Sequence, residues 1–220
     1  MNYYGSRLTC QEYRLRADRI CDRHRLELNK VYLIYVLIMI VIGVINSLTG
    51  TTEVLPDGTE ITSTWFNGLF DFIFGGAIMM GLIEISKKAY YNLEIKNKDL
   101  LHGFKDFVKS FLVYFLVSLY TALWAILLIV PGIIKMLSYS LALYVANDNP
   151  YMSANECITK SRELMDGHKW EYFKLIFSYF GWIILSVFTF GILLIWVLPR
   201  INQATYLFYL EVSGVGTDLA

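Results

Sequence analysis

The sequence predicts an all-α protein, a polytopic transmembrane helical bundle of about six spans. Three observations support this class. Residues 31–48 carry no charged side chain, and a helix of that length at ~1.5 Å per residue reaches ~27 Å, close to the ~30 Å hydrocarbon thickness of a bilayer. Comparable apolar stretches recur along the 220 residues, and 56% of the chain is hydrophobic, above the roughly 45–50% usual in soluble domains. The Lys and Arg residues lie in blocks between these stretches.

The order of the apolar stretches predicts a single bundle over 31–212 that contains helical hairpins broken by Pro or Gly. A 36-residue apolar stretch is too long for one crossing, and we expect its helix break at Pro131 and Gly132. In the last pair of spans, Gly191 is expected to form the turn, and Pro199 is a helix-breaking residue within the following helix. Residues 132–147 are few for a full crossing, so a tilted or re-entrant segment is the alternative. The expected spans are 31–50, 64–86, 109–130, 132–147, 172–190 and 192–212.

The basic residues predict the orientation of this bundle. Residues 1–30 hold seven Lys and Arg, 87–110 hold six and 147–175 hold four, whereas 51–65 hold none and three acids. With an even number of spans, both termini are expected in the cytoplasm and the bundle in the cell membrane. Residues 1–30 are expected to form a basic amphipathic segment on the inner leaflet, and 213–220 a flexible tail. Four acids among residues 1–30 leave no strongly basic patch, so we expect contact with membrane lipids and not with nucleic acid.

Ionisable side chains within spans are costly and therefore mark candidate sites. On the expected topology Asp71, Lys135 and Arg200 lie at similar depth in the outer half of the membrane, on three helices. We expect Asp71 to face one or both bases. Three interpretations remain open: a structural ion pair that sets helix register, a small polar cavity that binds an anionic group or relays a proton, or bases that extend to the outer headgroups.

A second group of charges lies at the cytoplasmic end of the second span. Glu84 precedes Lys87 and Lys88 by about one helical turn, which predicts an interfacial ion pair. It lies at the opposite depth from the predicted cluster.

The cytoplasmic residues 153–166 predict an amphipathic helix. Ser153 and Glu156 have the spacing of a capping box, and Ile158 and Met165 belong to an apolar stripe at helical spacing. Such a helix either docks a cytoplasmic or membrane protein partner or lies in the membrane interface.

Enzyme motifs are absent from the sequence: no GxSxG, HExxH, Walker A or GxGxxG pattern occurs. The histidines and cysteines are too scattered for a metal site, and the cysteines are expected to be reduced thiols. These residues are His24, His102, His168, Cys10, Cys21 and Cys157. We therefore expect no catalytic residue, no metal, no cofactor and no enzyme activity.

A train of short motifs runs through the second half of the chain and is specific as a set. The motifs are Leu123–Ser140, Asp148-Asn-Pro150, Ala154-Asn-Glu156, Ser161–Met165, Gly167-His-Lys169, Gly181-Trp182, Thr189-Phe-Gly191 and Leu198-Pro199. Together they resemble the bacterial integral membrane proteins grouped as domain of unknown function 975. The resemblance covers roughly 65–212 and implies a multi-pass protein of the inner (cytoplasmic) membrane without an established reaction.

Three classes of function follow from these observations. The first expectation is a non-enzymatic membrane scaffold or partner-binding protein, because the loops are short and one cytoplasmic helix suits docking. The alternative is a small transporter or permease-like subunit with a polar site near Asp71, Lys135 and Arg200, and a weak echo between the two Pro-containing hairpins favours it. A lipid-modifying enzyme is the third class, for which only Asp71 and Glu84 could serve. The oligomeric state does not follow from the sequence.

Overall fold

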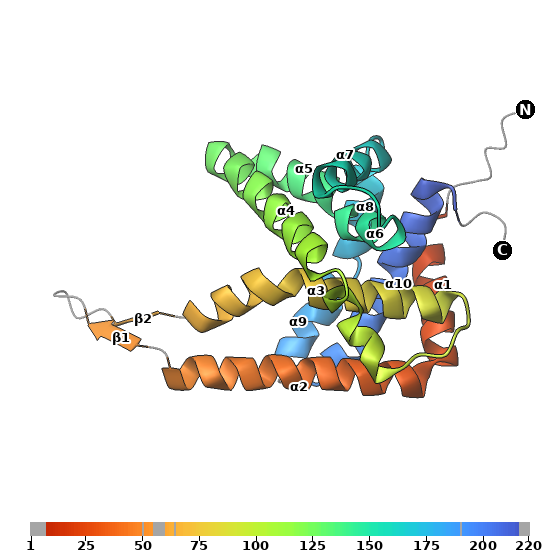
Figure 1. Ribbon diagram of the computed structural model, residues 1–220. Coiled ribbons are helices and arrows are strands. Elements are labelled where there is room, and N and C mark those ends of the chain that lie inside the picture. Colours follow the sequence, from red (N-terminus) through yellow and green to blue (C-terminus); the bar gives the residue numbers. More distant parts are fainter. Residues whose placement is uncertain (1–7, 50, 55–59, 64, 190, 216–220) are drawn as a thin grey trace, which may run out of the picture.

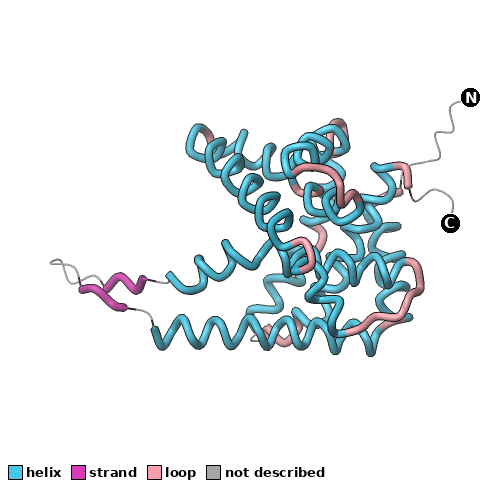
Figure 2. Tube along the Cα trace, viewed as in Figure 1, coloured by secondary structure: helices cyan, strands magenta, loops and turns pink. Residues whose placement is uncertain are grey.

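The computed structural model describes residues 8–49, 51–54, 60–63, 65–189 and 191–215. The described chain is helical, with one short two-stranded hairpin (Figures 1 and 2). Its helices are α1 (Cys10–Arg23), α2 (Arg25–Thr49), α3 (Trp65–Tyr90), the 3-10 helix η1 (Asn97–Phe104), α4 (Phe107–Leu127), α5 (Ile129–Tyr139), α6 (Ala142–Asp148), α7 (Ala154–Leu164), α8 (Lys169–Phe177), α9 (Phe180–Phe188) and α10 (Leu194–Ser213). The strands are β1 (Thr51–Val54) and β2 (Glu60–Ser63).

The strands form an antiparallel hairpin between α2 and α3, within the segment 51–65 that was expected to be a loop. Thr51 pairs with Ser63 and Val54 with Glu60. Figure 1 shows this hairpin at the far end of the α2–α3 pair, away from the rest of the molecule. Of the predicted tail 213–220, the structure describes residues 213–215. Gly214 ends α10 in the left-handed conformation (φ 72°). Residues 1–7 and 216–220 lie outside the described residues.

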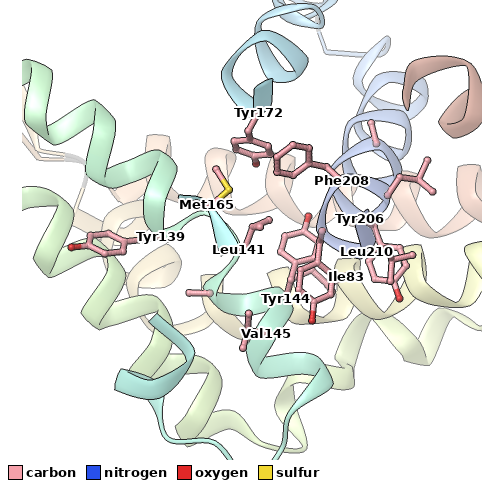
Figure 3. Packing of buried hydrophobic residues seen from close by; sticks show 14 of the residues in the cluster. Ile83, Tyr139, Leu141, Tyr144, Val145, Met165, Tyr172, Tyr206, Phe208 and Leu210 are labelled. Carbon is pink, nitrogen blue, oxygen red and sulfur yellow. The ribbon is translucent and has the colours of Figure 1, made fainter. Parts of the chain in front are cut away.

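Helix α10 is the centre of the fold. It contacts α1, α2, α3, α8 and α9, and ten of its residues are buried. Tyr206, Phe208 and Leu210 point into a core that also receives side chains from α3, α6 and α8 (Figure 3). Asn202 donates a hydrogen bond from Nδ2 to the hydroxyl of Tyr32 on α2 (2.8 Å). A helix enclosed by protein on so many sides has little surface left for lipid, although 192–212 was expected to be a span.

Four helical stretches of the described chain are long and apolar enough to cross a membrane. They are Arg25–Ile45, Phe107–Leu127, Ile129–Asp148 and Lys169–Phe188. The last two are each divided into two helices, α5–α6 and α8–α9. Large apolar side chains are exposed on α2, on α9 and around the α4–α5 connection. Exposure of this extent suits a lipid environment, because large contiguous apolar patches are rare on soluble monomers.

The break between α4 and α5 lies three residues before its expected place. Leu128 is the extended residue (φ −159°, ψ 134°), and Pro131 lies in the first turn of α5. The first turn of a helix has backbone N–H groups without intrahelical partners, so proline is tolerated there. Gly132 instead allows close packing, because a Cβ at that position would lie 2.8 Å from the Cα of Ala125 on α4. Pro199 is buried inside α10 and does not end that helix.

Glycines on α3 and η1 bring these two helices into backbone contact. A Cβ at Gly81 would overlap the carbonyl oxygen of Leu100, and one at Gly103 would overlap the carbonyl oxygen of Ala77. The connection after α3 therefore folds back along the helix, so that η1 lies beside residues 77–81. These contacts define the position at which α4 begins.

Helix α7 confirms the predicted capping box. The Ser153 hydroxyl accepts from the Glu156 N–H (3.4 Å), and the Glu156 carboxylate accepts from the Ser153 N–H (2.7 Å). The apolar stripe faces the inside of the protein, since Ile158 is 3% exposed and Met165 is fully buried. These two side chains are thus occupied by intramolecular packing and are not available to a partner.

Candidate functional site

The structure gives each member of the predicted charge cluster a different partner. Asp71 accepts a hydrogen bond from the hydroxyl of Tyr114 (2.8 Å). The Lys135 ammonium lies over the ring of Trp124, 4.7 Å from its centroid. Arg200 does not pair with Asp71, and its partners are on α1. Among the described side chains the expected grouping of the acid with the two bases is therefore not found.

Arg200 pairs with α1 because that helix lies antiparallel along α10. The Arg200 guanidinium contacts the carboxylate of Asp18 (Nε–Oδ1 2.8 Å) and that of Asp22 (3.5 Å). At the other end, the Glu211 carboxylate accepts from the Tyr13 hydroxyl (2.7 Å). Residues 1–30 were expected to lie on the inner leaflet, and the packing of α1 against α10 was not predicted. Consequently the charged N-terminal helix supplies the partners that Asp71 was expected to provide.

The second predicted ion pair is also arranged differently. Lys87 pairs with Asp148 (2.7 Å) and Lys88 with Asp99 (2.7 Å), and the Glu84 carboxylate accepts from the Asn147 side chain (3.2 Å). These contacts join α3 to α6 and η1, whereas neighbours on one helix were expected to pair with each other. Burial would raise the pKa of Asp99, but the Lys88 ammonium and the Lys96 N–H outweigh it and hold that pKa below its usual value.

A cavity of about 480 Å³ lies beside Arg200, between α1, α9 and α10. We call it the Arg200 cavity. Its charged lining residues come from α1, from the first residue of α2 and, in the case of Arg200, from α10. Its aromatic and aliphatic lining residues come from α9, α10 and the residues just before these helices. The lining residues are Arg14, Asp18, Asp22, Arg25, Tyr179, Trp182, Leu193, Trp196, Val197 and Arg200.

Three arginines and two aspartates give the lining residues a formal charge of +1 (three minus two). Asp18 and Asp22 are both engaged by Arg200, which also donates to the Trp196 carbonyl (2.7 Å). The Arg14 guanidinium lies over the Tyr179 ring, 5.2 Å from its centroid. The Arg25 side chain is exposed and makes no hydrogen bond or ion pair with any residue that the structure describes. The guanidinium groups of Arg14 and Arg25 thus retain hydrogen-bond donors for an anion.

Family comparison supports the resemblance predicted from the motifs. Residues 126–215 match the family described as Protein of unknown function (DUF975). The match is shorter than the expected range of 65–212. No curated protein and no solved structure matches the chain.

The DUF975 segment contains the aromatic wall of the Arg200 cavity and Arg200 itself, whereas the acidic partners on α1 lie outside it. Sequence reasoning singled out Arg200 and missed the α1 residues. A signal for them exists, because Arg14, Asp18 and Asp22 are spaced i, i+4 and i+8 and therefore share one face of a helix. The sequence predicted this segment to lie on the inner leaflet, whereas in the structure α1 packs against α10.

The cysteines are free thiols in the structure. Cys21 and Cys157 are buried, and Cys10 is partly exposed. Burial raises the pKa of Cys21 to about 12, although the nearby Arg200 charge opposes the shift. Burial likewise raises the pKa of Cys157. Neither buried cysteine is suited to nucleophilic chemistry, which requires the thiolate.

Proposed function

We propose that this chain is a non-enzymatic binding protein of a bacterial cell membrane, with both termini in the cytoplasm, and that the Arg200 cavity binds an anionic lipid. The observation that carries the proposal is the composition of the cavity wall. The lining combines charged side chains, including the guanidinium groups of Arg14 and Arg25, with aromatic and aliphatic side chains, and this combination matches a molecule with an anionic head and an apolar body.

The membrane part of the proposal is supported by the exposed apolar surface and by the distribution of charge. Four stretches of the described chain suit a membrane, and seventeen of the nineteen basic residues lie in the segments expected in the cytoplasm (seven, six and four). The acidic segment between α2 and α3 is expected on the opposite side. Family membership over residues 126–215 adds no activity.

The charged wall suits a phosphate group. Guanidinium groups bind phosphate through charge-assisted, often bidentate hydrogen bonds, and each hydrogen bond to a charged group contributes about 1.5–3 kcal/mol. Arg14 and Arg25 supply such donors to the lining, which also contains Trp182 and Trp196. Tryptophan favours the headgroup level of a bilayer, where one end of its ring is apolar and the other wet. The cavity is therefore suited to a lipid at the interface.

Lipid binding to the full chain in nanodiscs tests the proposal. Thermal stability is compared in phosphatidylglycerol and in phosphatidylcholine nanodiscs, for the native chain and for Arg14→Gln combined with Arg25→Gln. We expect the native chain to be stabilised by the anionic lipid and the double variant to lose about 10–100-fold in affinity, corresponding to one phosphate contact. Arg19→Gln is the matched control, because Arg19 is on α1, exposed, and bonded to the Leu15 carbonyl outside the cavity.

Inorganic phosphate provides a further arm of the same experiment. Stabilisation by phosphate alone at similar concentration would identify the ligand as a free anion, and no difference between the double variant and the control would refute the cavity as the site. The permease-like alternative predicted a polar site near Asp71, Lys135 and Arg200. Among the described residues these three side chains have separate partners, so they do not form the shared polar site of that alternative.

A further inference from the structure

The connection between α4 and α5 is an apolar tip. Ile126, Leu127, Leu128, Ile129 and Val130 are between 62% and 83% exposed. The two helices behind the tip are in close contact through Gly132 and Ala125. Figure 1 shows the α4–α5 pair projecting from one side of the molecule. The tip is thus held out by packed helices, and its exposed side chains need an apolar environment.

Helix α7 indicates how far this tip reaches. The Tyr120 hydroxyl on α4 donates to the Asn155 side chain on α7 (3.2 Å). The outer face of α7 is charged, with four exposed ionisable side chains that do not belong in hydrocarbon. They are Glu156, Lys160, Arg162 and Glu163. The level of Tyr120 is therefore outside the hydrocarbon core.

Of α4, only the residues that follow Tyr120 in the sequence can therefore enter the hydrocarbon core from the cytoplasmic side. Residues 121–127 complete α4, and these seven residues at ~1.5 Å each extend ~10 Å. The hydrocarbon core is ~30 Å thick. A hairpin of this reach ends within the nearer leaflet and does not cross, whereas 109–130 and 132–147 were expected to be two crossings.

Trp124 and Lys135 support a shallow position. Their cation–π contact (4.7 Å) lies about one helical turn behind Leu128, on the two helices of the hairpin. Tryptophan and lysine are the side chains that anchor a segment at the headgroup level, since each has an apolar part and a polar end. Their position agrees with an insertion depth of about 5–10 Å for the residues in front of them.

We propose that the α4–α5 tip (Ile126–Val130) is a wedge that inserts among the acyl chains of the cytoplasmic leaflet and does not reach the opposite surface. The inference uses the membrane orientation of the proposed function and is independent of the Arg200 cavity. The occupant of this apolar surface is lipid hydrocarbon, because the tip is flanked by an interfacial Trp–Lys pair and by the charged helix α7.

Depth-dependent quenching tests the wedge. A fluorescent NBD group is attached to Leu128→Cys in the full chain with Cys10→Ser, in vesicles that contain lipids spin-labelled near the headgroup or near the bilayer centre. We expect the shallow label to quench at least about twofold more than the deep one. Ile38→Cys, near the middle of α2, is the control and should show the opposite order. Stronger quenching of Leu128→Cys by the deep label, or its labelling by an impermeant reagent from the far side, would overturn the proposal.

A charge placed in the tip gives a second readout. With the probe at Leu128→Cys, Ile129→Glu should withdraw the tip, so that quenching by spin-labelled lipid falls and quenching by aqueous iodide rises at least twofold. A tip that already emerges into water would show no change in either quenching. Tryptophan-monitored unfolding establishes that the variant is folded. Loss of lipid binding in the Arg14 and Arg25 variants would not alter this result, so the two proposals fail separately.

Discussion

The break between α5 and α6 depends on one hydroxyl group from α7. Ser161 is fully buried; its hydroxyl accepts from the Leu141 N–H (3.2 Å) and donates to the Ser138 carbonyl (2.9 Å). In a continuous helix, Leu141 would donate to the carbonyl of Leu137. Here that carbonyl accepts from the N–H (3.4 Å) and the hydroxyl (2.8 Å) of Ser140. Ser161 thus supplies the hydrogen bonds that the helix break removes.

Ser161→Ala should therefore be strongly destabilising for so small a change. It would leave a buried N–H and a buried carbonyl without that partner, and each such group costs about 1–3 kcal/mol. After some local relaxation we expect the free energy of unfolding to fall by about 2–4 kcal/mol. For a chain of this length, that corresponds to a decrease in Tm of roughly 5–15 °C.

The assay is thermal unfolding of the detergent-solubilised chain, followed by tryptophan fluorescence. Ser138→Ala is the matched control, because Ser138 is also buried and its hydroxyl only donates to the Ile134 carbonyl of its own helix (2.8 Å). Removing such a local bond should change stability by less than about 1 kcal/mol. Equal decreases in Tm for the two variants would refute the role assigned to Ser161.

Three further predictions concern packing, thiol access and pH. Gly81→Ala should lower the free energy of unfolding by about 1–3 kcal/mol, because its Cβ would overlap the backbone of η1. Gly43→Ala on α2 is the control and should be neutral or stabilising, because nothing lies within 4 Å of a Cβ there. Unfolding of both variants in detergent tests this prediction. Of the three cysteines only Cys10 should react with maleimide in the native protein, and all three after denaturation, as counted by mass spectrometry. The pKa of Asp99 is lower in the folded than in the unfolded chain, so its pairing with Lys88 stabilises the fold above about pH 4 and is lost as pH falls further. Asp99→Asn should therefore lower Tm at pH 7. Below about pH 4 the Tm of this variant should decrease less than the Tm of the native chain.

Local sequence signals predicted the elements whose structure is determined locally. The capping box of Ser153 and Glu156 correctly marks the start of α7, and the uncharged residues 31–48 lie within α2. The α4–α5 break was misplaced for a local reason, since Pro131 fits a first helical turn as well as it breaks a helix interior.

The sites were harder to predict because they depend on which helices become neighbours. Arg200 was assigned to the correct helix, but its partners on α1 are about 180 residues away in sequence (|i−j| 182 for Asp18 and 178 for Asp22). Helix α10 was expected to be a span, but it is not among the four described stretches that are apolar enough to cross a membrane, and its tertiary packing covers most of its surface with protein. Six straight crossings would place Asp71 and Arg200 at the same depth in the membrane. In the structure Asp71 contacts Tyr114 and Arg200 contacts Asp18.

The α9–α10 hairpin extends the reasoning applied to the α4–α5 tip. Arg200 is the seventh residue of α10, so the helix from Leu194 to Arg200 extends ~10 Å. Its partners Asp18 and Asp22 are on the charged helix α1, which would have to enter hydrocarbon if this hairpin crossed a ~30 Å core, at a cost of several kcal/mol. The α2–α3 hairpin differs, because an acidic segment joins its helices and needs water at the far surface. One crossing hairpin with two shallow ones leaves both termini on the basic side, so the proposed orientation does not require six full spans.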